Sequence, residues 1–183
     1  MKKRGGGRVT HALIDNSATL VFLADQACIT PHVWLSRTDQ LAHPDQMIFD
    51  LDPPEGNFRL ACTAALALHE LLSELGLAAC VKTTGAKGLH VQVPLDRRAR
   101  FDEVRAFARE VADVLASKDT GRFTTEQRKG KRRGRLYIDV MRNAYGQTAV
   151  APSPCVPAPA RRWRPRLRGR SSLTAVLRRS DST

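Results

Sequence analysis

The sequence predicts an α+β fold in which a mostly antiparallel sheet carries two main helices on one face. Between residues 47 and 141, the apolar pattern gives the order strand, helix, hairpin, helix, strand. The chain has 183 residues, which suits one domain better than two. Its apolar fraction of 42% allows a real core, and an aromatic fraction of 5% makes that core mostly aliphatic.

The first elements lie upstream of this core. Residues 1–8 are basic and glycine-rich, and we expect them to be flexible. Residues 18–28 are apolar and form either a helix or a buried strand. The segment 30–35 should be extended, because the residue before Pro31 is pushed out of the α region.

Four strands are expected in the core. Residues 47–52 form a strand that two prolines stop. Residues 79–83 and 89–93 form two strands joined by a glycine-rich turn, and residues 136–141 form a further strand.

Two amphipathic helices separate these strands. Asn57 can cap the first helix and Gly76 can end it, because apolar residues recur between them at spacings of three and four. Asp102 is predicted to cap the second helix, whose apolar face runs to Leu115.

The formal net charge of +12 is concentrated at the two ends of the chain. Residues 1–8 contribute +4 and residues 161–183 contribute +7, so the body is nearly neutral at +1. Prolines and arginines dominate residues 153–183, and we expect this tail to be disordered and dispensable for the core. The change of composition is also what a shifted reading frame in a GC-rich gene would produce.

One basic run lies inside the body, where residues 128–135 hold six cations. Such a run is either a solvated loop or a site of phosphate contact. Its place between two segments rich in polar motifs favours contact with nucleic acid, with these candidates: Arg128, Lys129, Lys131, Arg132 and Arg133.

The cellular setting follows from cysteine usage and hydropathy. The four cysteines are far apart and form no CxxC pair, which suits free thiols in a reducing compartment and disfavours a zinc site. No apolar run approaches the roughly 20 residues that span a bilayer. We therefore expect a cytoplasmic protein without a membrane partner.

Three acids point to chemistry. Asp50 and Asp52 alternate with Leu51 at the end of a strand, so both carboxylates project from one face and repel unless a cation lies between them. The other interpretation is a pair of turn-capping residues before the prolines. Asp139 lies in a strand otherwise free of acids, and three carboxylates from neighbouring strands can hold two divalent ions for nucleotidyl transfer.

A glycine-rich turn supplies the complementary charge. Gly85 and Gly88 allow a tight turn with exposed N–H groups, Thr84 offers a hydroxyl, and Lys87 a positive charge for phosphate. His90 lies on the strand face opposite the apolar residues. Without the three acids, an ordinary hairpin would explain the turn equally well.

Five segments in order resemble the polymerase domain of bacterial DNA ligase D, a member of the archaeo-eukaryotic primase superfamily. The resemblance covers residues 9–152, and its segments are TPHVWLSR (30–37), MIFDLDP (47–53), VKTTGAKGLHV (81–91), RFTTEQRK (122–129) and RNAYGQTAVAP (142–152).

The resemblance implies an activity and a set of roles. Such domains add ribonucleotides or deoxynucleotides to a DNA primer end in non-homologous end joining, beside Ku and a ligase domain or separate ligase. Asp50, Asp52 and Asp139 match the acids that bind Mn²⁺ or Mg²⁺. The turn residues and His90 match positions that hold the triphosphate, although serine is commoner at the position of Thr84. Two further matches are residues needed for activity: His32 and Arg142.

Compared with the family that it resembles, the sequence departs from the expected pattern at both ends. The family has a further N-terminal segment that grips the DNA end, and the chain begins after it. Beyond residue 152 the family continues with a tyrosine and alternating arginines, which the tail replaces. A catalytically inactive remnant, or a nucleic-acid-binding module, is therefore the alternative to an active polymerase core. The family's setting is the bacterial cytoplasm, in association with the nucleoid.

Overall fold

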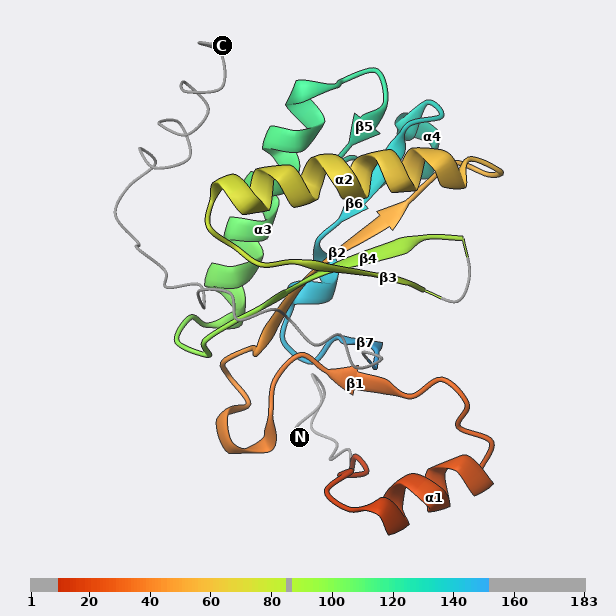
Figure 1. Ribbon diagram of the computed structural model, residues 1–183, viewed down its shortest axis with the longest axis vertical. Coiled ribbons are helices and arrows are strands. Elements are labelled where there is room, and N and C mark those ends of the chain that lie inside the picture. The colour runs from red at the N-terminus through yellow and green to blue at the C-terminus, as the bar shows by residue number, and fades with distance from the viewer. Residues whose placement is uncertain (1–9, 85–86, 152–183) are drawn as a thin grey trace. The chain divides into compact units, whose positions relative to one another are not determined.

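A computed structural model describes residues 10–84 and 87–151 of the chain (Figure 1). The predictions for residues 1–8 and 153–183 lie outside these ranges. The chain divides into two compact units, residues 1–32 and residues 33–183. No helix among the described residues is long and apolar enough to cross a membrane.

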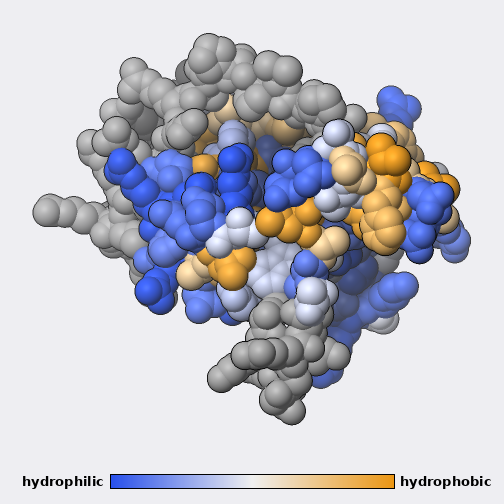
Figure 2. Space-filling model, turned by 90° about the horizontal axis from the view of Figure 1, so that it is seen from below, coloured by the Kyte–Doolittle hydropathy of each residue, from blue (hydrophilic) through white to orange (hydrophobic). Residues whose placement is uncertain are grey.

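Helix α1 (Ser17–Asp25) lies in the N-terminal unit. Asn16 caps it, because its side-chain oxygen accepts a hydrogen bond of 2.9 Å from the N–H of Thr19. No residue of this helix is buried, so the alternative of a buried strand is wrong. Figure 2 shows hydrophobic residues between hydrophilic ones on the surface of the molecule. The large hydrophobic residues that are exposed in the N-terminal unit are Leu13, Ile14, Leu20, Val21, Phe22 and Ile29.

The larger unit is built on a five-stranded sheet in the order β3–β4–β2–β6–β5. The strands are β2 (Gln46–Asp52), β3 (Cys80–Thr83), β4 (Leu89–Pro94), β5 (Phe123–Thr124) and β6 (Leu136–Asp139). All neighbours pair antiparallel except β5, which pairs parallel to β6. The predicted mostly antiparallel sheet is confirmed, whereas β5 is too short for its alternation to be recognised in the sequence.

Two helices cover one face of this sheet, as predicted: α2 (Phe58–Glu74) and α3 (Phe101–Lys118) (Figure 1). Alternate strand residues such as Phe49 and Val91 are fully buried against them. Asn57 caps α2 as expected, since its side chain accepts a 3.1 Å hydrogen bond from the Leu60 N–H. The intervening residues of each strand face the opposite, open side.

The predicted cap of the second helix is wrong by two positions. Helix α3 begins at Phe101, and its N-cap is Arg100 rather than Asp102. The Glu103 carboxylate accepts a 2.7 Å hydrogen bond from the backbone N–H of Arg100, which satisfies a donor that a capping Asp102 would leave exposed. Phe101 is buried, so packing also favours the earlier start.

The strand predicted over residues 136–141 ends at Asp139, because the chain then turns into the short helix η2 (Met141–Asn143). Asn143 is fully buried and fixes this turn to β2. Its side chain accepts a 2.8 Å hydrogen bond from the Ile48 N–H and donates a 2.7 Å hydrogen bond to the Ile48 carbonyl. These paired bonds satisfy the backbone groups of Ile48, which lies outside the part of β2 that pairs with β6.

The remaining elements are short. Strand β1 (His32–Trp34) pairs with β7 (Thr148–Val150) in a two-stranded sheet, and the extended segment predicted after residue 30 is thus confirmed. Short helical turns are also formed at η1 (Thr38–Gln40) and α4 (Lys129–Arg132).

Candidate active site on the open face of the sheet

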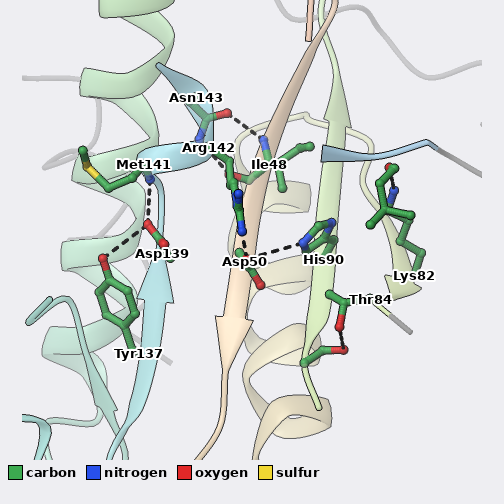
Figure 3. A network of polar contacts seen from close by, with 12 residues as sticks. Ile48, Asp50, Lys82, Thr84, His90, Tyr137, Asp139, Met141, Arg142 and Asn143 are labelled. Carbon is green, nitrogen blue, oxygen red and sulfur yellow. Dashed lines mark hydrogen bonds and ion pairs between the residues drawn. The ribbon is translucent and has the colours of Figure 1, made fainter. Parts of the chain in front are cut away.

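Four charged or titratable residues form a row across the open face of the sheet. The register places Lys82 of β3 opposite His90 of β4, His90 opposite Asp50 of β2, and Asp50 opposite Asp139 of β6. Figure 3 shows them in that order across the four strands. Residues directly opposite each other on neighbouring strands have Cβ atoms about 4.5–5.5 Å apart. The two acids that are 89 positions apart in the sequence are therefore direct neighbours.

Asp50 is the most buried acid of the site, at 7% exposure. Its Oδ2 atom lies 3.5 Å from His90 Nε2 and 3.6 Å from Arg142 Nε. Arg142 comes from η2, which Asn143 fixes to the same strand. A buried carboxylate is costly without partners, and these two basic groups partly offset that cost.

Asp139 is held by neutral donors instead. Its Oδ1 accepts a 2.7 Å hydrogen bond from the Met141 N–H and a 3.2 Å hydrogen bond from the Tyr137 hydroxyl. Burial, followed by the negative charge of Asp139, raises the pKa of Tyr137 to about 12. The phenol is therefore a hydrogen-bond donor at neutral pH.

Asp52, at the end of β2, lies opposite Tyr137 in the register. Partial burial raises the pKa of its carboxyl, and the negative charges of Asp50 and Asp139 raise it further. The positive charges of Arg132 and Arg142 act in the opposite direction. The negative charges of Asp50 and Asp139 thus act on Asp52, and a cation would relieve this repulsion.

The fit to a divalent ion rests on the chemistry of these donors. Carboxylate oxygens are the ligands that Mg²⁺ and Mn²⁺ prefer. Asp50 and Asp139 are neighbours, and Asp52 is within electrostatic reach of both. Within residues 10–84 and 87–151, no three His, Cys, Asp or Glu side chains already form a metal-binding group. The donor set suits the ion, and the assignment of all three acids as its ligands stays a prediction.

The glycine-rich turn lies between β3 and β4. Thr84 closes it, with its N–H and hydroxyl 3.3 Å and 3.1 Å from the Gly88 carbonyl. A Cβ at Gly88 would lie only 2.7 Å from the Leu51 carbonyl oxygen, so this position requires glycine. Lys87 is exposed and pairs with Glu55 at 2.8 Å. Gly85 lies outside the described residues.

These features have clear counterparts among known proteins. The LigD primase-polymerase domain model matches residues 1–155. The chain belongs to this family. It is 36% identical over 139 residues to the multifunctional non-homologous end joining protein LigD of Pseudomonas aeruginosa, covering 75% of this chain and 16% of that protein. It is 31% identical over 148 residues to the bifunctional LigD of Bacillus subtilis, covering 80% of this chain and 24% of that protein.

A solved structure shares the fold. The polymerase domain of Mycobacterium tuberculosis ligase D in complex with DNA matches with a TM-score of 0.69 and 28% sequence identity. The match covers 79% of this chain and 56% of the solved chain. The chain thus spans about a quarter or less of the curated LigD relatives named above, and somewhat over half of the solved polymerase domain. The predicted family and fold are confirmed.

Two further residues predicted from the LigD resemblance have different placements. Arg142 contacts Asp50 directly, as described above. His32 is the last residue of the N-terminal unit, and its Nδ1 lies 3.1 Å from the Thr30 carbonyl oxygen. Its part in activity stays a prediction.

The basic run of this LigD-type domain contains two kinds of side chain. Arg132 donates to the carbonyls of Gln127 at 2.9 Å and Glu126 at 3.2 Å, and its guanidinium lies 4.0 Å from the centre of the Tyr137 ring. It therefore holds the loop together. The other four candidates are exposed, and phosphate contact stays a prediction for them: Arg128, Lys129, Lys131 and Arg133.

Three residues of the site were not assigned a role from the sequence. Lys82 lies in the cross-strand row and donates a hydrogen bond to the Val150 carbonyl, while burial lowers the pKa of its amine. Tyr137 and Asn143 act through hydrogen bonds to Asp139 and Ile48. The alternation of β3 could have indicated Lys82, because it places Lys82 and Thr84 on one face. The other two depend on tertiary contacts.

Proposed function

We propose that this chain carries the nucleotidyl-transfer site of a LigD-type polymerase, which extends a DNA primer end during non-homologous end joining. The observation that carries the proposal is the direct pairing of Asp50 with Asp139, beside His90, on the open face of the sheet. In this reaction the primer 3′ oxygen forms a bond to the α-phosphorus of a nucleoside triphosphate. The bond to the departing pyrophosphate breaks, and the hydroxyl proton is lost.

The acids would hold the divalent ion, Mn²⁺ or Mg²⁺, through Asp50 and Asp139, with Asp52 as the third ligand. When bound, the ion supplies charge neutralisation at the α-phosphate and lowers the pKa of the attacking hydroxyl. Arg142 and His90 flank Asp50, so they orient its carboxylate, and Arg142 adds positive charge where phosphate negative charge develops.

The turn would hold the triphosphate of the NTP or dNTP. Gly88 lets the backbone lie against β2, and Lys87 extends from the turn as an exposed cation. The Lys87–Glu55 pair is solvent-exposed, and water screens the attraction between such groups, so the pair contributes little stability. A triphosphate can therefore replace Glu55 as the partner of Lys87 at little cost. Thr84, Gly85 and His90 complete the proposed binding set.

The proposed partners are a DNA end, Ku, and a ligase domain or separate ligase. The solved relative was obtained in complex with DNA. Four exposed cations of the basic run provide sequence-independent phosphate contacts here, which weaken as the salt concentration rises.

A second candidate function is a nucleic-acid-binding module without catalysis. It is favoured by the environment of Asp50, whose negative charge is already offset by the Arg142 guanidinium. An acid compensated within the protein has less need of a metal ion.

Primer extension distinguishes the two candidates. The full chain is incubated with a recessed DNA primer, Mn²⁺ or Mg²⁺, and each NTP or dNTP in turn. We expect extension that is lost, by at least about 100-fold, in Asp50→Ala, because the variant lacks a central ligand of the ion. Asp102→Asn, at an exposed acid of α3, is the matched control and should keep full activity.

A gel-shift measurement with the same DNA completes the test. DNA binding without extension under any nucleotide or metal supports the binding module and contradicts catalysis. Extension that persists in Asp50→Ala contradicts the proposed site.

A further inference from the structure

Tyr137 is a buried side chain, 3% exposed, on the open face of β6. Its hydroxyl donates a hydrogen bond to Asp139 Oδ1 at 3.2 Å, and the Met141 N–H donates to the same oxygen at 2.7 Å. Figure 3 shows the two bonds converging on this atom. Among the hydrogen bonds found within the described residues, those to the Asp139 carboxylate involve Oδ1, which leaves Oδ2 for a ligand.

The ring that carries this hydroxyl is itself fixed. The Arg132 guanidinium lies 4.0 Å from the ring centre, within the range of a cation–π contact. Arg132 is in turn held by the carbonyls of Glu126 and Gln127, at 3.2 Å and 2.9 Å. A buried ring between a strand and an anchored arginine has little rotational freedom, so the hydroxyl stays aimed at Asp139.

The donors around Asp139 differ from those around Asp50 in a way that matters for a metal ion. The Arg142 guanidinium lies 3.6 Å from Asp50, and a positive group reduces the attraction of a carboxylate for a divalent cation. The phenol and amide on Asp139 are neutral, so they orient the carboxylate while leaving its full negative charge. Outer hydrogen bonds of this kind commonly set the affinity of metal sites.

We propose that Tyr137 is a positioning residue whose hydroxyl fixes the Asp139 carboxylate, so that the remaining oxygen stays available to the divalent ion. Arg132 supports this role by holding the ring. The inference rests on the proposed function, because it concerns one of the acids assigned there to the metal.

The test measures Mn²⁺ binding by the full chain without nucleotide or DNA, from the loss of the electron paramagnetic resonance signal of free Mn²⁺. Tyr137→Phe removes the hydroxyl and keeps the ring under Arg132. We expect it to weaken Mn²⁺ binding about 10-fold. Tyr145→Phe, at the half-exposed tyrosine that packs on Trp34 and Phe101, is the matched control and should bind like the parent.

Three further variants separate the possible results. In a double-mutant cycle, adding Tyr137→Phe to Asp139→Asn should cause no loss beyond that of Asp139→Asn, because the hydroxyl acts through Asp139. Tyr137→Leu removes the ring as well. Parent-like binding by Tyr137→Phe, with weak binding by Tyr137→Leu, would overturn the proposal, since packing alone would then matter.

The same binding measurements test the proposed function separately from the role of Tyr137. If the parent does not bind Mn²⁺, or if Asp50→Asn and Asp139→Asn bind it as well as the parent does, the acids are not a metal site and both proposals fall. If these two variants lose binding while Tyr137→Phe keeps it, only the role of Tyr137 is wrong. Thermal melting of each variant shows whether it is folded at the temperature of the binding measurement.

Discussion

The two faces of the central sheet are made by the same strands and serve different purposes. On β2, Phe49 is completely buried beneath α2 and α3, while its neighbour Asp50 faces the open side with His90 and Arg142. The covered face is apolar and sets the stability of the fold. The open face gathers acids and basic groups that the fold must hold close together. Single substitutions should therefore affect stability on one face and chemistry on the other.

The largest effect is expected on the covered face. Phe49→Ala should lower the free energy of unfolding by about 3–5 kcal/mol, because it removes a buried ring and leaves a cavity between sheet and helices. Urea denaturation followed by circular dichroism measures this change. Asp50→Asn is the control on the adjacent residue, and a loss as large as that of Phe49→Ala would contradict the division between the faces.

Asn143 should be an exception to this division, because its substitution should affect both stability and activity. It is fully buried beside β2 and bonds both backbone groups of Ile48, as well as the Val140 carbonyl at 3.0 Å. Asn143→Ala leaves these buried groups unpaired, at a cost of about 2–3 kcal/mol. It should also weaken primer extension, since η2 carries Arg142. A variant with normal stability, measured by urea denaturation, would show that water replaces the lost bonds.

Gly88 tests how tightly the turn must lie against β2. A Cβ at this position would come within 2.7 Å of the Leu51 carbonyl oxygen, a backbone atom that can move only with its strand. Gly88→Ala should cost about 1–3 kcal/mol through overpacking and shift β2 beside Asp50. Thermal melting checks the stability. Gly130→Ala, in open space on α4, is the control and should leave the melting temperature nearly unchanged.

Sequence patterns identified the elements whose residues alternate or recur strongly. The strand ending in Asp52 and the helix capped by Asn57 were predicted because each combines apolar periodicity with a clear stop or cap. The start of α3 was misplaced because Glu103 caps the helix from inside its first turn. The short strand β5 has only two residues, too few for a period to show.

The candidate site shows more clearly what local sequence patterns can and cannot predict. Alternation placed Asp50 and Asp52 on one face, and the isolated acid in β6 indicated Asp139. The register that pairs Asp50 with Asp139 is a tertiary property that local patterns do not determine. The same holds for the bonds from Arg132 to the carbonyls of its own loop, and its contact with nucleic acid stays a prediction. A basic run in the sequence does not reveal which side chains hold the loop together.

The smallest expected effect is on the free energy of unfolding, which the charge of Asp52 on the open face lowers. Because partial burial and the neighbouring acids raise the pKa of Asp52, its charged form is disfavoured in the folded state. Well below its unfolded pKa, such a carboxyl is neutral in the folded and the unfolded state and does not affect stability. As the pH rises from the unfolded pKa to the folded pKa, the carboxyl increasingly destabilises the fold, and the full effect remains at higher pH. Asp52→Asn should therefore stabilise the metal-free protein at neutral pH, by at most about 0.5 kcal/mol, while reducing primer extension.

Urea denaturation at two pH values sharpens this last comparison. The gain of Asp52→Asn over the parent should be present at pH 7 and vanish near pH 3, where the carboxyl is protonated in both states. Saturating Mn²⁺ should reverse the order at pH 7, because an ion that binds only the folded parent stabilises it. A variant that is less stable than the metal-free parent at pH 7 would show that Asp52 supports the fold. Repulsion among the three acids would then not be the feature that distinguishes the open face.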